Sequence, residues 1–108
     1  MQVRPVSSSE MSLRDATRLR LEENLGQVQF SDLRAHLDRD AVFVVEATLS
    51  LVDCAVSVAM DDVDVVKEWI TSGELRKPSK QERTDWPGRE EPLWWAVVVD
   101  PFVLVQDA

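Results

Sequence analysis

The sequence has one cysteine, one histidine, three glycines and no tyrosine among its 108 residues. A single cysteine excludes a disulfide framework and any zinc site built from several thiolates. Bases are scarce as well: twelve Lys and Arg stand against twenty Asp and Glu, which gives a formal net charge of -8. Because binding to a phosphate backbone requires a basic surface, this deficit argues against a nucleic-acid partner.

Long apolar runs are also missing. The longest, Leu93 to Val99, is far shorter than the ~20 residues of a membrane-spanning helix. No apolar stretch of the signal-peptide type follows Met1. We therefore expect a cytoplasmic protein with a reduced thiol and no membrane partner. Residues 1–10, rich in serine, are expected to form a flexible tail, and residues 11–107 a single globular domain.

Three serines each stand three residues before an acid, a spacing typical of helix N-termini. They are Ser12, Ser50 and Ser79. Apolar residues at helical spacing predict helices over about 13–25 and 31–39, after Ser50, and from about Asp62 until Gly73. After Ser79 the apolar content is low, so only one or two surface turns are expected there.

Runs of β-branched and aromatic residues predict strands at Val42–Glu46, Leu93–Val99 and Phe102–Gln106, with a short one at Glu74–Lys77. Continuous apolar runs at the C-terminal end are typical of central strands covered on both faces. Tight two-residue hairpins favour glycine or asparagine at positive φ, so Asp100-Pro101 predicts a wider turn or a kinked strand.

Together these elements predict an α+β fold. We expect a single two-layer domain of about four helices, arranged as two hairpin-like pairs. The helices pack on a small, mostly antiparallel sheet of three to four strands.

An acidic cluster follows the predicted helix after Ser50. Asp61 and Asp62, with Asp53 nearby, offer the oxygen ligands that a divalent cation prefers. The cluster lacks the glycine and the distal glutamate of an EF-hand loop. Acids before a helix also bind its free N–H groups, so capping is the simpler interpretation of the cluster.

A nucleophile–base pair of Cys54 and His36 is the other candidate for chemistry. Cys54 stands in the middle of an apolar helix with no cationic neighbour in sequence, which is typical of an inert core thiol. His36 falls on the polar side of a short helix. We therefore predict no catalytic residue and no cofactor. The bases between Arg76 and Arg89 alternate with acids, which indicates a solvated face.

Core packing is the simpler interpretation of each tryptophan, since aromatic side chains dominate core energetics. The candidates for an interaction surface are Trp86, Trp94, Trp95 and Phe102. Trp94 and Trp95 are adjacent in a predicted strand and therefore point to opposite faces. One of them is expected to pack under the helices. The other requires cover from a loop, a ligand or a second chain.

Two blocks carry a family resemblance: Leu49–Asp62, continuing through Val66–Trp69 and Gly73–Lys77, and Trp95–Gln106. With the first helix they resemble the bacterial domain-of-unknown-function 2288 family over about residues 12–106. The resemblance implies a small bacterial cytoplasmic protein and supplies no activity, substrate or cofactor.

Two functional hypotheses follow. The first is a non-catalytic interaction domain that forms a homodimer through its apolar C-terminal strands, since 108 residues are few for covering both faces. The second is a small-molecule-binding or divalent-metal-binding protein, or an enzyme, with an acidic pocket around Asp53, Asp61 and Asp62.

Overall fold

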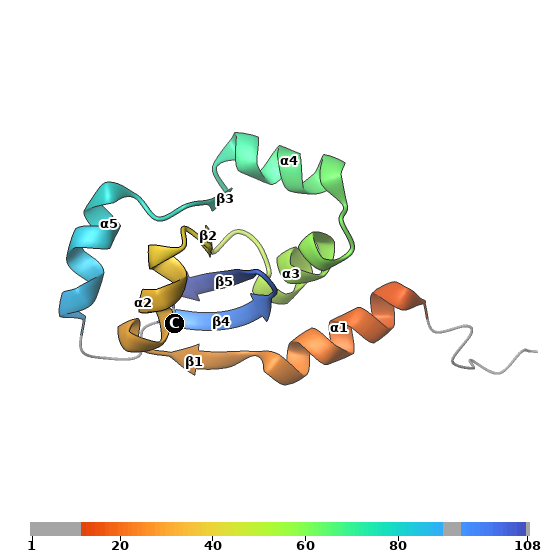
Figure 1. Ribbon diagram of the computed structural model, residues 1–108. Coiled ribbons are helices and arrows are strands. Elements are labelled where there is room, and N and C mark those ends of the chain that lie inside the picture. Colours follow the sequence, from red (N-terminus) through yellow and green to blue (C-terminus); the bar gives the residue numbers. More distant parts are fainter. Residues whose placement is uncertain (1–11, 90–93, 108) are drawn as a thin grey trace, which may run out of the picture.

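The computed structural model describes residues 12–89 and 94–107, in which helices pack on a five-stranded sheet (Figure 1). Its α-helices are α1 (Leu13–Asn24), α2 (Phe30–Asp38), α3 (Leu51–Ala59), α4 (Val63–Ser72) and α5 (Lys80–Asp85), and a 3-10 helix, η1 (Trp86–Gly88), follows α5. Its strands are β1 (Gly26–Val28), β2 (Val42–Val45), β3 (Leu75–Arg76), β4 (Trp94–Val99) and β5 (Phe102–Asp107). The expected fold class and the mostly antiparallel sheet are confirmed. The expected numbers of helices and strands are slightly low. The tail predicted at residues 1–10 lies outside the described residues.

The three serine caps are confirmed. The Oγ atoms of Ser12, Ser50 and Ser79 each accept a hydrogen bond from the backbone N–H three residues later, at 3.0, 3.2 and 3.0 Å. Each cap satisfies one of the N–H groups that a helix leaves unpaired at its start. At the other end of α4, Gly73 adopts φ 86°, the left-handed conformation that glycine reaches without steric penalty.

The five strands form one sheet in the order β1-β4-β5-β2-β3. β5 pairs antiparallel with β4 and parallel with β2, and the other pairs are antiparallel. The C-terminal strands are therefore central, as their apolar runs predict.

The turn between β4 and β5 differs from the prediction. Val99 pairs directly with Phe102, so Asp100 and Pro101 form a tight two-residue turn with a cis peptide bond between them. The prediction of a wider turn or a kinked strand was wrong because it considered only turns with glycine or asparagine at positive φ. A cis proline at the third position defines another kind of tight turn.

Helices cover both faces of the sheet, so the expected two-layer arrangement was wrong. On one face a core cluster joins α1, α3 and the strands, with Val97 and Leu104 at its centre. On the opposite face α2 and η1 pack over Val103 and Val105. The strand residues alternate between the two clusters because successive side chains of a strand point to opposite faces.

Of the two expected pairs of neighbouring helices, the structure contains one. α3 and α4 are neighbours joined by a short connection. α1, in contrast, packs on α3, while α2 contacts β2 from the other face. α1 and α2 lie on different faces because β1, which was not predicted, separates them. Its residues Gly26–Val28 pair with β4 and carry the chain across the sheet edge between the two helices.

Candidate functional site

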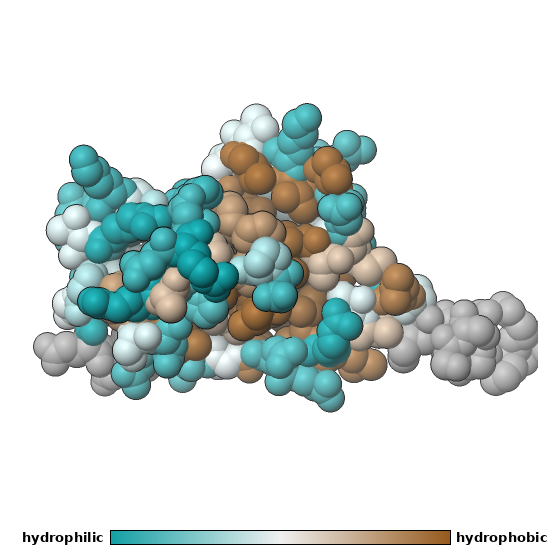
Figure 2. Space-filling model, viewed as in Figure 1, coloured by the Kyte–Doolittle hydropathy of each residue, from teal (hydrophilic) through white to brown (hydrophobic). Residues whose placement is uncertain are grey.

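The most unusual feature of the surface is helix α4. Its apolar stripe is strongly one-sided, yet none of its residues is buried. Val63 is 59% exposed and Ile70 52% exposed. In the space-filling view hydrophobic side chains gather over α4 and the area beneath it (Figure 2). An amphipathic helix normally buries its apolar stripe against the core, so α4 leaves part of its stripe without cover.

A groove runs along this stripe, with a volume of about 410 Å³. We call it the α4 groove. The apolar residues that line it are Val58, Val63, Val66, Ile70 and Phe102, and the charged ones are Asp61, Asp62 and Lys67. A second, wholly apolar cavity of about 180 Å³ adjoins it and shares Val58, Val66, Ile70 and Phe102. The groove therefore has an apolar floor and a charged rim.

Two phenylalanines from neighbouring strands support the floor of the groove. The rings of Phe43 and Phe102 meet edge to face, with centroids 5.5 Å apart and an interplanar angle of 86°. Phe102 is 37% exposed, and the two-residue turn at Asp100 and Pro101 fixes its place at the start of β5. Phe102 is one of the residues predicted to form an interaction surface, and the structure places it in the groove.

The three acids of the predicted metal site are separated. Asp61 and Asp62 lie together on the rim of the α4 groove. Asp53 lies at the other end of α3, where its carboxylate pairs with Arg18 of α1 at 2.5 Å. Asp62 pairs more loosely with Arg14, at 3.8 Å. Among the residues that the structure describes, no group of three or more His, Cys, Asp or Glu side chains is placed to hold a metal ion.

The four tryptophans divide into core and surface residues. Trp86 and Trp94 are 2% and 1% exposed and pack against each other at a tilt, so they offer no surface to a partner. Trp69 of α4 is half-buried against the α3 core. Trp95 is 39% exposed on the face opposite to Trp94, as their adjacent positions in a strand predict. Of the predicted interaction residues, only Trp95 and Phe102 are therefore accessible.

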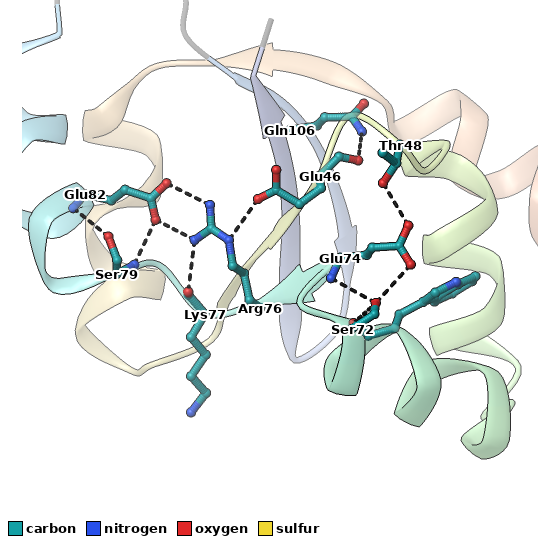
Figure 3. A network of polar contacts seen from close by, with 10 residues as sticks. Glu46, Thr48, Ser72, Glu74, Arg76, Lys77, Ser79, Glu82 and Gln106 are labelled. Atoms are coloured by element: carbon teal, nitrogen blue, oxygen red, sulfur yellow. Dashed lines mark hydrogen bonds and ion pairs between the residues drawn. The ribbon is translucent and has the colours of Figure 1, made fainter.

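A polar network surrounds Arg76 at the edge of the sheet (Figure 3). Its guanidinium donates to Glu46 at 2.8 Å and to both carboxylate oxygens of Glu82 at 2.7 and 3.0 Å. The hydrogen bonds from Arg76 hold the pKa of Glu82 below its ordinary value, and the two carboxylates raise the pKa of Arg76. These three side chains line a cavity of about 210 Å³ that Trp86 also borders.

Neighbouring hydrogen bonds fix the segment between β2 and α3. Gln106 donates from its Nε2 to the carbonyls of Glu46 and Leu49, at 3.0 and 2.8 Å. Glu74 accepts hydrogen bonds from Thr48 and Ser72 (Figure 3). Both sets of bonds tie the chain before α3 to distant parts of the sequence.

The bases between Arg76 and Arg89 are largely used in ion pairs of this kind. Lys77 and Arg83 both pair with Asp40, at 2.5 and 3.0 Å. The hydrogen bond from Lys77 lowers the pKa of Asp40. Glu46 and Asp40 could not be predicted as partners because each stands at least 30 residues from its base, and no local spacing links them.

Cys54 and His36 do not form a catalytic pair. Cys54 of α3 is 0% exposed, and burial raises the pKa of its thiol to about 12. His36 belongs to α2, which covers the opposite face of the sheet, and its Nδ1 lies 2.5 Å from the guanidinium of Arg39. A protonated, buried thiol is a poor nucleophile.

No helix among residues 12–89 and 94–107 has the length and apolar character needed to cross a membrane.

Comparison with known proteins supports the fold and leaves activity open. No curated protein matches the sequence. The NMR solution structure of PA1075 from Pseudomonas aeruginosa is similar, with a TM-score of 0.72 and 29% sequence identity over 94% of this chain and 91% of that one. The family model described as protein of unknown function (DUF2288) matches residues 16–107. The chain therefore belongs to this family, as the resemblance of its two sequence blocks predicts.

Proposed function

We propose that this protein is a non-catalytic interaction domain that self-associates through the α4 groove. The observation that carries the proposal is the uncovered stripe of α4, where Val63 and Ile70 are more than half exposed. Exposed apolar side chains scattered singly are common on proteins, but a contiguous apolar groove with a charged rim is typical of an interaction site.

The surface differs from the one expected from the sequence. Helices cover most of both faces of β4 and β5, which are central strands, and of their hydrophobic residues only Trp95, Val98 and Phe102 are exposed. Phe102 is the part of these strands that contributes to the groove. The proposal therefore keeps self-association and moves its surface from the strands to α4 and Phe102.

We place this interaction in the bacterial cytoplasm. Two observations support that setting: the similar solved structure comes from a bacterium, and the lone cysteine, Cys54, is fully buried without a disulfide partner. A reducing compartment suits a thiol of this kind.

The test is the oligomeric state across concentration, measured by sedimentation velocity from about 5 μM to about 1 mM, the range in which small interfaces dissociate. We expect reversible dimerisation of the wild type. Ile70→Asp should raise the dissociation constant roughly 30-fold or more, because it places a charge in the apolar contact.

Leu19→Asp is the matched control. Leu19 is 52% exposed, as Ile70 is, but it lies on α1 and does not line the groove. It should leave the dissociation constant unchanged. A wild type that stays monomeric at about 1 mM would contradict self-association. Equal effects of the two variants would contradict the choice of surface.

A further inference from the structure

A small apolar cavity lies behind α4, between this helix and the sheet. We propose that it binds a neutral molecule built on a single aromatic ring. The cavity is complete within one copy of the chain, so the ligand needs no dimer to bind.

Five elements form the wall of this cavity, which has a volume of about 180 Å³: α3, α4, β2, β3 and β5. Leu75 of β3 and Leu104 of β5 are 2% and 1% exposed, so they form its closed inner end. Four of its lining residues also line the α4 groove: Val58, Val66, Ile70 and Phe102. The cavity therefore has a buried floor and opens into the groove.

The lining decides the polarity of the ligand. Among the residues that the structure describes, only hydrophobic side chains line the cavity. A charged or strongly polar group placed there would lose its contacts with water and gain no hydrogen-bond partner, which is costly. A water molecule held in a cavity needs roughly two to four polar partners, so water is a poor occupant as well. The cavity therefore selects an uncharged, apolar ligand.

The size and the walls of the cavity favour a single aromatic ring. An apolar cavity of about 150 Å³ can stay dry and bind benzene, and this one is slightly larger. Two of its lining residues, Phe43 and Phe102, are aromatic, and their rings meet edge to face. Because aromatic rings prefer edge-to-face and offset contacts with one another, a third ring in the cavity finds partners of the matching kind.

The packing of α4 leaves this space open. Protein interiors are dense enough that voids much larger than a water molecule are few. α4 has no buried residue, so its side chains do not fill the space between the helix and the buried leucines of the floor. A ring in the cavity would contact α4 on one side and Leu75 and Leu104 on the other. It would thus supply dispersion contacts that the free protein lacks.

Methyl NMR locates the ligand, with toluene as the probe and protein labelled at the methyl groups of Ile, Leu and Val. We expect saturable shifts of the signals of Val66, Leu75 and Leu104, with a dissociation constant on the order of 0.1–1 mM. The signals of Leu33 and Leu37, which lie under α2 on the opposite face of the sheet, should stay unchanged. Benzoate is the charged probe of similar size and should cause no saturable shift.

Two variants of α4 separate the cavity from the groove. Val66→Phe places a ring of its own in the cavity and should weaken toluene binding roughly 10-fold or more. Val63→Phe is the matched control, since Val63 lines the groove but not the cavity. It should bind toluene within about 2-fold of the wild type. Thermal unfolding checks that both variants are folded.

The proposal is overturned if toluene causes no saturable shift of the cavity methyl groups, or if benzoate binds as well as toluene. Equal toluene affinity of the two folded variants would also overturn it, because the probe would then lie outside the cavity. If Val66→Phe does not fold, the pattern of methyl shifts in the wild type decides where the probe binds.

Discussion

The indole rings of Trp86 and Trp94 pack against each other with centroids 4.8 Å apart and an interplanar angle of 59°. Trp86 stands in η1, just after α5, and Trp94 begins β4. The guanidinium of Arg89 lies over the ring of Trp94, 4.9 Å from its centroid. This contact holds the segment after β3 against the face of the sheet that α2 also covers.

The burial of Trp86 against Trp94 predicts that Trp86 contributes strongly to the free energy of unfolding. Trp86→Ala should lower the free energy of unfolding by about 3–5 kcal/mol, because it removes a large side chain from a well-packed core. Trp95→Ala is the control: Trp95 is 39% exposed, and its loss should be about 1 kcal/mol. Urea denaturation of both variants measures the difference. Equal losses would show that Trp86 is not a core residue.

Stability should fall in acid through Glu82. Its pKa is lowered from an ordinary 4.5, mainly by its hydrogen bonds with Arg76. A lowered pKa means that Glu82 contributes its full stabilisation above pH 4.5 and loses it as the pH falls through the lowered value.

The measurement is urea denaturation of the wild type and Glu82→Gln at a series of pH values. At neutral pH the variant should be less stable by about 1–2 kcal/mol, a range that allows for partial exposure of the pair. The difference should shrink in acid, where the wild-type carboxylate is protonated. A difference that stays constant with pH would mean that the charge of Glu82 has no part in it.

The thiol of Cys54 should be unreactive in the folded protein. Its pKa is raised to about 12 by burial, so the thiolate that reacts with disulfide reagents is almost absent at about pH 8. A chromogenic disulfide reagent should modify less than one tenth of the native protein in the time that denatured protein reacts fully. Rapid labelling under native conditions would indicate that α3 opens readily.

Divalent cations should leave the melting temperature unchanged. Asp53 pairs with Arg18 at the start of α3, away from Asp61 and Asp62, and two aspartates alone offer too few oxygen ligands. Thermal unfolding with and without about 5 mM Mg²⁺ or Ca²⁺ is the measurement, because a ligand of the native state raises the melting temperature. A rise that Asp61→Asn abolishes would instead support the metal-binding alternative.

Local signals in the sequence predicted the helices well because each helix start is encoded within a few residues. Ser50 caps α3 by accepting a hydrogen bond from the N–H of Asp53, and the spacing of these residues is visible in the sequence. The central position of β5 was equally visible, since its apolar residues must be covered on both faces.

The parts that sequence reasoning missed depend on contacts between distant residues. β1 is three residues long and becomes a strand only because β4 pairs with it. Trp86 was also a candidate for an interaction surface, and its burial follows from Trp94 and α2 on the same face. The α4 groove could not be predicted because the stripe of α4 looks like any core-facing stripe. Its exposure follows from where α3 and the sheet end.

The position of β5 in the sheet has a consequence for synthesis in the cell. Its residues Phe102–Asp107 lie between β4 and β2, so every segment before it emerges from the ribosome before the sheet can close. Until residue 107 has left the exit tunnel, β2 and β4 present unpaired backbone edges to other chains. Truncation before Phe102 should therefore yield an aggregating chain in place of a smaller domain.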